Sequence, residues 1–125
     1  MVEDVVARAR GCLGARFRPH GRDPAYGLDC VGVAGVAFGR AMLPADYPLR
    51  GGSAAGIAAE VARAGLVPSG AARAGDLALF DLGAGQLHLA VLTGAGFVHA
   101  DARLRRVVEV PGQAPWPMLG SWREA

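Results

Sequence analysis

The sequence predicts an α+β fold in which helices come first and an antiparallel sheet follows. Apolar residues recur at helical spacing in the first half of the chain, and after Gly75 the pattern changes to the alternation that is typical of strands. Short glycine-containing breaks of hairpin length separate the strand segments. Helical and strand segments are therefore segregated along the chain, which is the pattern of α+β domains rather than of alternating βαβ units.

Residues 2–13 predict the first helix. Apolar side chains, Cys12 among them, recur on one stripe of this segment, and Gly14 stands where the helix would end. Residues 14–29 show neither helical nor strand periodicity and are rich in turn-forming residues, so we expect a loop there. This loop leads directly into Asp29 and Cys30.

Residues 31–42 are apolar or small on every side, which predicts a helix buried in the core, with Asp29 able to cap its start. Glycines inside this segment each cost about 1 kcal/mol of helix propensity relative to alanine. We therefore expect a close neighbour at this helix, and the sheet is the expected partner. After a linker over 43–52, Ser53 can cap a third helix that ends at Gly65.

The second half of the chain predicts an antiparallel meander. Its strands are expected at 76–82, 86–93, 96–101, 105–110 and, as a short last piece, 119–122. The chain has 125 residues, which is the length of one domain, so residues 1–125 are expected to form a single unit around one core.

The composition argues against several classes of function. All 13 basic residues are arginine, they are scattered along the chain, and the net charge is only +2, so a nucleic-acid partner is not expected. The longest apolar stretch, 31–38, is too short to span a bilayer, so membrane insertion is not expected. No Cys-x-x-Cys, His-x-x-x-His or nucleotide-binding glycine motif is present, so we expect neither a metal nor a cofactor. The acidic start of the chain, with no apolar segment behind it, predicts synthesis in the cytoplasm without a signal peptide.

The two cysteines differ in their surroundings. Cys12 lies on an apolar helix stripe and is most simply a core residue. Cys30 lies at the start of the buried helix, where the helix dipole and unpaired N–H groups favour a negative charge, and we expect this position to lower the pKa of its thiol. Cys30 is thus a candidate nucleophile, and a second buried thiol is the alternative.

A cysteine nucleophile needs a base, and the chain has three histidines. His88 points to the face of its predicted strand opposite an apolar ladder, so it is the candidate base, and a core histidine is the alternative. His99 lies on the next predicted strand, where it could orient His88 across the sheet, and Asp101 competes for that role. His20, in the loop before Cys30, belongs either to the rim of a cleft or to a loop hydrogen bond.

Three stretches of the chain resemble the NlpC/p60 family of cysteine peptidases. Gly27-Leu28-Asp29-Cys30-Val31-Gly32 is similar to the nucleophile motif of that family, and Ala74-Gly75-Asp76-Leu77 is similar to its strand opener. His88-Leu89-Ala90-Val91, followed by Gly96-Phe97-Val98-His99-Ala100, is similar to its paired-histidine segment. Order and spacing agree over nearly the whole chain. Within the family, the sequence resembles the short versions that are encoded among phage tail genes and in gene transfer agents.

The resemblance implies a papain-like fold and an endopeptidase that cuts the bond between γ-D-glutamyl and a diamino acid in the stem peptides of peptidoglycan. Matched residue by residue, Cys30 corresponds to the nucleophile, His88 to the base and His99 to the third polar member. Phe17 stands where many members of the family carry a tyrosine. Four residues are expected around the substrate cleft: Phe17, His20, Tyr26 and Asp29.

Two alternatives stay open. The same fold and site could cut a different amide, such as the muramoyl–alanine bond, or the domain could be a structural component of a phage-like tail tip whose catalytic residues are relics. The resemblance implies delivery in a phage-like particle that acts in the periplasm of a target cell. For contact with tail proteins the candidates are Trp116, Met118 and Trp122, and a terminal strand that covers the sheet edge is the alternative for these residues.

Overall fold

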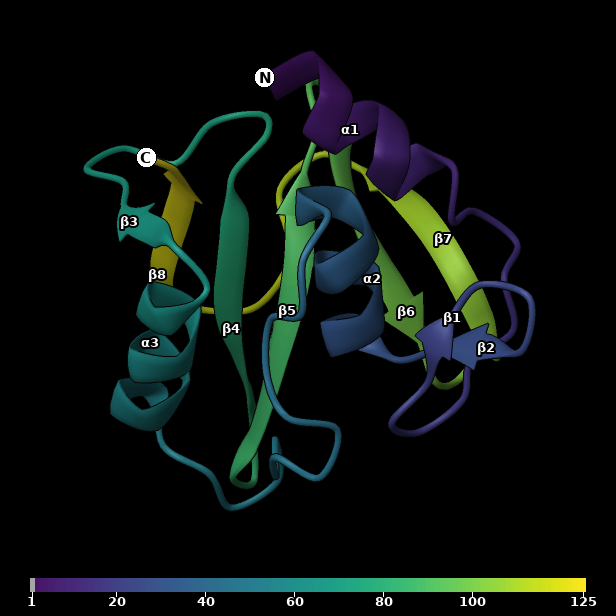
Figure 1. Cartoon of the computed structure of the whole chain (residues 1–125), viewed down its shortest axis with the longest axis horizontal. Helices are drawn as coiled ribbons and strands as arrows, with labels where there is room; N and C mark the ends of the chain where they lie inside the picture. Colours follow the sequence, from purple (N-terminus) through teal and green to yellow (C-terminus); the bar gives the residue numbers. More distant parts are fainter. Residues whose placement is uncertain (1) are drawn as a thin grey trace.

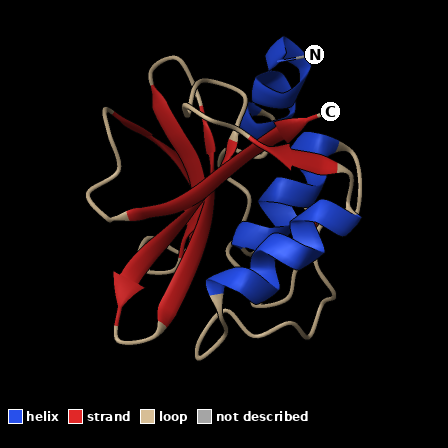
Figure 2. Cartoon of the chain, turned by 90° about the vertical axis from the view of Figure 1, so that its left-hand side faces the viewer, coloured by secondary structure: helices blue, strands red, loops and turns tan. Residues whose placement is uncertain are grey.

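A computed structural model describes residues 2–125 and has an α+β architecture, as the sequence predicts. The helices lie on one face of a six-stranded antiparallel sheet (Figures 1 and 2). The helices are α1 (Val2–Arg10), α2 (Cys30–Phe38) and α3 (Ala54–Arg63). The strands of the sheet are β3 (Leu66–Pro68), β4 (Leu77–Gly83), β5 (Gln86–Leu92), β6 (Gly96–Asp101), β7 (Arg106–Pro111) and β8 (Met118–Glu124). Two short strands, β1 (Arg22–Asp23) and β2 (Gly27–Leu28), form a separate hairpin in the segment predicted to be a loop.

The helices begin close to the predicted positions but end earlier. α1 ends at Arg10 rather than residue 13, and turns carry the chain to residue 14. α2 ends at Phe38 rather than residue 42, because Gly39 adopts a left-handed conformation with φ of 67° that glycine enters without strain. Ser53 caps α3 as predicted, since its hydroxyl accepts a hydrogen bond from the Gly56 amide.

The sheet has the strand order β3-β8-β4-β5-β6-β7, which differs at one edge from the predicted meander. β4 to β7 follow one another as expected, but β8 crosses back to pair with β4 instead of extending the sheet beyond β7. β3, which the sequence pattern did not reveal, pairs with the outer side of β8. The register of β8 places Trp122 opposite Leu77, so the indole is buried in the core with only 6% of its surface exposed.

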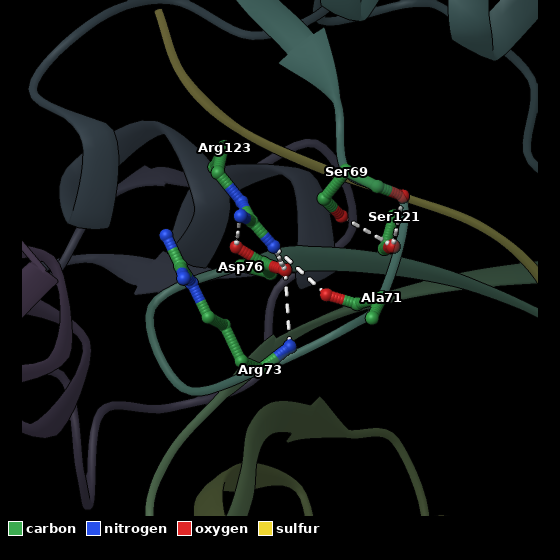
Figure 3. Close-up of polar contacts among 6 residues, drawn as sticks. All are labelled: Ser69, Ala71, Arg73, Asp76, Ser121 and Arg123. Atoms are coloured by element: carbon green, nitrogen blue, oxygen red, sulfur yellow. Dashed lines mark hydrogen bonds and ion pairs between the residues drawn. The ribbon is translucent and has the colours of Figure 1, made fainter.

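A buried ion pair fixes β8 to the loop that precedes β4 (Figure 3). Asp76, with 1% of its surface exposed, accepts hydrogen bonds from Nε and Nη2 of Arg123 at 3.1 and 2.9 Å and from the Arg73 amide at 3.0 Å. Next to it, the hydroxyls of Ser69 and Ser121 lie 2.6 Å apart. The aspartate that opens the strand in the sequence motif therefore has a structural role.

Apolar side chains fill both faces of the sheet. The main core lies between the helices and the sheet, and it includes Cys12 of the turn after α1 as predicted. A smaller cluster occupies the opposite face and is covered by the segment between β7 and β8, which contributes Trp116. Its buried members are Ala78, Phe80, Ala90 and Phe97. Among residues 2–125, no helix is long and apolar enough to cross a bilayer.

Candidate active site

The start of α2 is held by one carboxylate. Asp29 Oδ1 accepts hydrogen bonds from the Gly32 amide and from Arg22 Nη1, both at 2.9 Å, and its Oδ2 accepts one from the His20 amide at 2.9 Å. The first of these bonds is the predicted cap of the buried helix. Because the other two tie the preceding loop to the same carboxylate, Asp29 fixes where Cys30, the first residue of the helix, stands.

Gly32 explains part of the unusual glycine content of this helix. A Cβ atom at this position would lie 2.2 Å from the carbonyl oxygen of Gly21 and 2.9 Å from Cδ2 of Leu28. The close neighbour of this helix face is therefore the loop before the helix, and the expectation that it would be the sheet is wrong for Gly32. The absence of a side chain lets the loop that carries His20 lie directly on the start of α2.

The sheet opens where Cys30 meets it. β5 and β6 pair only at Val91 with Val98 and at Leu92 with Phe97, and beyond this point each strand continues with its other neighbour. α2 contacts both strands. The backbone of Leu89 forms a hydrogen bond with the Cys30 sulfur, so the thiol lies beside the residue that follows His88.

The two histidines that the sequence singled out contact each other directly. Nε2 of His88 lies 2.8 Å from Nδ1 of His99, and the ring planes meet at 85°. Nε2 of His99 in turn lies 3.9 Å from Oδ2 of Asp101. The two candidates for orienting His88 are therefore arranged in series, with His99 in contact with His88 and Asp101 behind His99.

Trp116 packs edge-on against both imidazoles. Its ring centroid lies 5.5 Å from that of His88 and 5.8 Å from that of His99. For Trp116 the sequence left a tail contact and a terminal segment that covers the sheet edge as alternatives, and in the structure the indole covers the histidine pair because the segment before β8 folds across the sheet. Of the two other candidates for that contact, Trp122 is a core residue and Met118 is 44% exposed. No sequence pattern pointed to Trp116 as part of the site, since its neighbours in space come from β4, β5 and β6.

Burial is the largest influence on the pKa values of Cys30 and His88. It raises the pKa of the Cys30 thiol to about 12 and, together with the charge of His99, lowers the pKa of His88 to about 4. The expectation that the helix start would lower the pKa of Cys30 is therefore wrong, because desolvation of the thiolate outweighs the helix dipole and the two backbone hydrogen bonds to sulfur. At neutral pH the resting pair is a thiol and a neutral imidazole.

A cleft of about 850 Å³ exposes this group of residues. Cys30, His88 and His99 line it, as do Phe17, His20 and Asp29, which were expected around the substrate. Tyr26 does not line it, since it lies in the turn between β1 and β2 with 69% of its surface exposed. The cleft also receives side chains that the sequence analysis missed, among them Tyr47, Arg50 and Arg103. These come from irregular segments on either side of the site, where no periodic pattern could indicate their direction.

Both cysteines are free thiols, and in the described residues 2–125 no group of three or more His, Cys, Asp or Glu side chains could hold a metal ion. A thiol at a helix start and a neutral imidazole line the same cleft, and one nitrogen of that imidazole is held by a second ring; such a set of groups can perform nucleophilic attack with general-base assistance.

Comparison of the structure with solved structures identifies the proteins whose fold this chain shares. The NlpC/p60 domain of the peptidoglycan hydrolase SagA superposes with a TM-score of 0.62 at 24% identity, over 89% of each chain. The chain has the NlpC/p60 fold. A p60 domain from Mycobacterium avium subspecies paratuberculosis matches with a TM-score of 0.60 at 21% identity, over 98% of this chain and 93% of that one.

The NlpC/p60 fold also occurs in a longer neighbour, the peptidoglycan hydrolase RipB from Mycobacterium tuberculosis. It matches with a TM-score of 0.60 at 25% identity, and the match covers 98% of this chain but 63% of RipB. No protein-family model matches the chain, and no curated protein sequence matches it significantly. The likeness therefore lies in the tertiary structure, and the papain-like arrangement that the sequence motifs implied is confirmed at that level.

Proposed function

We propose that this chain is a cysteine peptidase that hydrolyses amide bonds in the stem peptides of peptidoglycan. The observation that carries the proposal is the convergence of Cys30, His88 and His99 in one cleft of an NlpC/p60 fold. Two of the solved neighbours, SagA and RipB, are named peptidoglycan hydrolases.

The contact between the two imidazoles determines which ring nitrogen of His88 can act as the base. Because Nε2 of His88 is engaged with His99, Nδ1 is the nitrogen left to accept the proton of the Cys30 thiol as sulfur attacks the substrate carbonyl. The backbone N–H of Cys30, in the first turn of α2 where no intrahelical acceptor exists, can stabilise the oxyanion. His88 then gives its proton to the leaving amine, which leaves a thioester on Cys30.

Water completes the reaction. His88, again neutral, takes a proton from a water molecule that attacks the thioester carbonyl, and the second tetrahedral intermediate breaks down to a carboxylic acid and the Cys30 thiol. At neutral pH the His88 ring is unprotonated, because burial and the charge of His99 lower its pKa to about 4, so the ring has a nitrogen available to accept a proton.

The bond that we propose is the one between γ-D-glutamyl and the diamino acid. The sequence motifs support this choice. The cleft lining includes the exposed Arg50 and Arg103, which can pair with free carboxylates of a substrate, beside the carboxylates of Asp29, Asp46 and Asp101. The muramoyl–alanine bond is the alternative, and the products of digestion distinguish the two.

The test is a digest of purified muropeptides followed by mass spectrometry. The wild-type protein should release a fragment that begins with the diamino acid, whereas release of intact stem peptide from the sugar would indicate an amidase. Cys30→Ala and His88→Ala should abolish turnover and keep the fold, and His99→Ala should leave a residual rate, because an orienting group is partly replaceable. No cleavage of any muropeptide by the folded wild-type protein would contradict the proposal and favour a structural role.

We further propose that the protein acts from a phage-like particle. It would be assembled with tail proteins and reach the periplasmic peptidoglycan of a target cell. The resemblance to short phage-tail and gene-transfer-agent sequences supports this route. Mass spectrometry of particles purified from the native host should detect the chain, and its presence only in the soluble lysate would contradict the delivery proposal without affecting the hydrolase.

A further inference from the structure

The carboxylate of Asp101 has two oxygens with different surroundings. Oδ1 accepts hydrogen bonds from the amides of Arg103 and Leu104 at 2.8 and 3.0 Å, and these bonds shape the turn between β6 and β7. Oδ2 makes neither of these bonds and lies 3.9 Å from Nε2 of His99. One oxygen therefore serves the turn, and the other faces the histidine pair.

A single proton lies between the two rings, and its position decides whether His88 can act as a base. If Nε2 of His88 carries the proton, Nδ1 of His88 is bare and can accept the thiol proton, and His99 must then be protonated on Nε2. If Nδ1 of His99 carries it instead, both neutral rings take the opposite tautomer. In that case a bare Nε2 of His99 faces Asp101, and Nδ1 of His88 carries a proton and cannot accept one from the thiol.

We propose that Asp101 is a positioning residue that selects the productive tautomer of both histidines. A carboxylate attracts an N–H and repels a nitrogen lone pair, so a negative Oδ2 at 3.9 Å favours the proton on Nε2 of His99. That choice makes Nδ1 of His99 an acceptor, places the shared proton on His88 and leaves Nδ1 of His88 free.

The charges around the pair are consistent with this role. Burial by itself would raise the pKa of Asp101, but the hydrogen bonds from the amides of Leu104 and Arg103, with nearby positive charge, outweigh it and keep the pKa below its usual value, so the carboxylate is ionised at neutral pH. The cleft beside the two rings is lined by Cys30 from α2, Asp101 from β6 and Arg103 from the following turn, and also by His20, Asp29, Asp46 and Arg50, while Trp116 covers the rings without a charge. Of these groups, Asp101 acts electrostatically on both rings.

Asp101→Asn separates the two roles of the side chain. An asparagine keeps one carbonyl oxygen for the amides of Arg103 and Leu104, but it presents an amide N–H₂ group instead of a carboxylate oxygen to His99. The matched control is Asp81→Asn, because Asp81 Oδ1 accepts a hydrogen bond from the Gly83 amide in another hairpin and does not line the cleft.

The measurement is the tautomeric state of both histidines, read from two-bond ¹H–¹⁵N correlation spectra of ¹⁵N-labelled protein at neutral pH. In the wild type and in Asp81→Asn, both His88 and His99 should carry the proton on Nε2. In Asp101→Asn, both should shift toward the Nδ1-protonated form, and kcat/KM should fall by at least about 10-fold, because the histidine then presents an N–H where the base is needed. The melting temperature should match that of Asp81→Asn.

The expected fall in kcat/KM rests on the proposed hydrolase function, whereas the tautomeric state of the histidines can be measured without any turnover. Unchanged tautomers in Asp101→Asn would overturn it, as would a wild type whose His88 carries the proton on Nδ1. Tautomers that shift as expected in a protein that cleaves no muropeptide would instead leave the proton arrangement in place and contradict the proposed function.

Discussion

The low pKa of His88 predicts how kcat/KM changes at acidic pH. His88 must be neutral to act as a base, and burial lowers its pKa to about 4. At pH 5 a group with that pKa is about 90% neutral, whereas an ordinary histidine with a pKa of about 6.5 is about 3% neutral. We therefore expect kcat/KM to stay nearly constant from pH 7 down to pH 5 and to be halved near pH 4.

The perturbation that tests the cause is Trp116→Ala. The indole packs against His88 and His99, so its removal admits water to the rings, and the pKa of His88 should rise by about one unit. At pH 5 the variant would then retain about half of its own plateau activity. Trp116→Phe is the matched control, because an aromatic ring still covers the imidazoles and the midpoint should stay near that of the wild type.

Two assays report the same midpoint. One is the pH profile of kcat/KM on a defined muropeptide, and the other is an NMR titration of the His88 ring, which needs no turnover. Because the unfolded chain binds this proton near pH 6.5 and the folded chain near pH 4, folding stability falls as the pH decreases through that interval, so circular dichroism should confirm folding at each pH. A wild-type midpoint near 6.5, or a midpoint that Trp116→Ala does not move, would refute the reasoning.

Three further predictions concern stability and thiol reactivity. Asp76→Ala removes one partner of a buried ion pair, and urea unfolding should show a loss of about 3 kcal/mol; a loss below about 1 kcal/mol would show that the pair contributes little. Gly32→Ala should cost about 1–3 kcal/mol, because its Cβ would clash with a loop carbonyl, while Gly70→Ala, with open space around it, should change stability by less than about 0.5 kcal/mol. Iodoacetamide should label Cys30, which lines the cleft, before the core residue Cys12. Because burial raises the pKa of the Cys30 thiol, the labelling rate should keep rising above pH 9. Equal rates for the two cysteines in the folded protein would contradict this assignment.

The local sequence was sufficient for the class of fold and for the elements that carry the candidate site. The helical and strand periods depend on which residues alternate along the chain, and they placed Cys30 at a helix start and His88 and His99 on neighbouring strands. Capping by Asp29 and Ser53 was likewise predictable, since a cap involves residues three positions apart.

Only the tertiary structure decided what lies between elements that are distant in the chain. The return of β8 to pair with β4 buries Trp122 and lays Trp116 over the histidines, and no local pattern encodes which strand edge a terminal segment will join. The direction of the Cys30 pKa shift was also set there, because the local helix dipole favours the thiolate whereas desolvation depends on every element packed around the sulfur. The sequence thus determined which side chains could react, and the packing of the sheet against α2 decided their protonation and which of them meet.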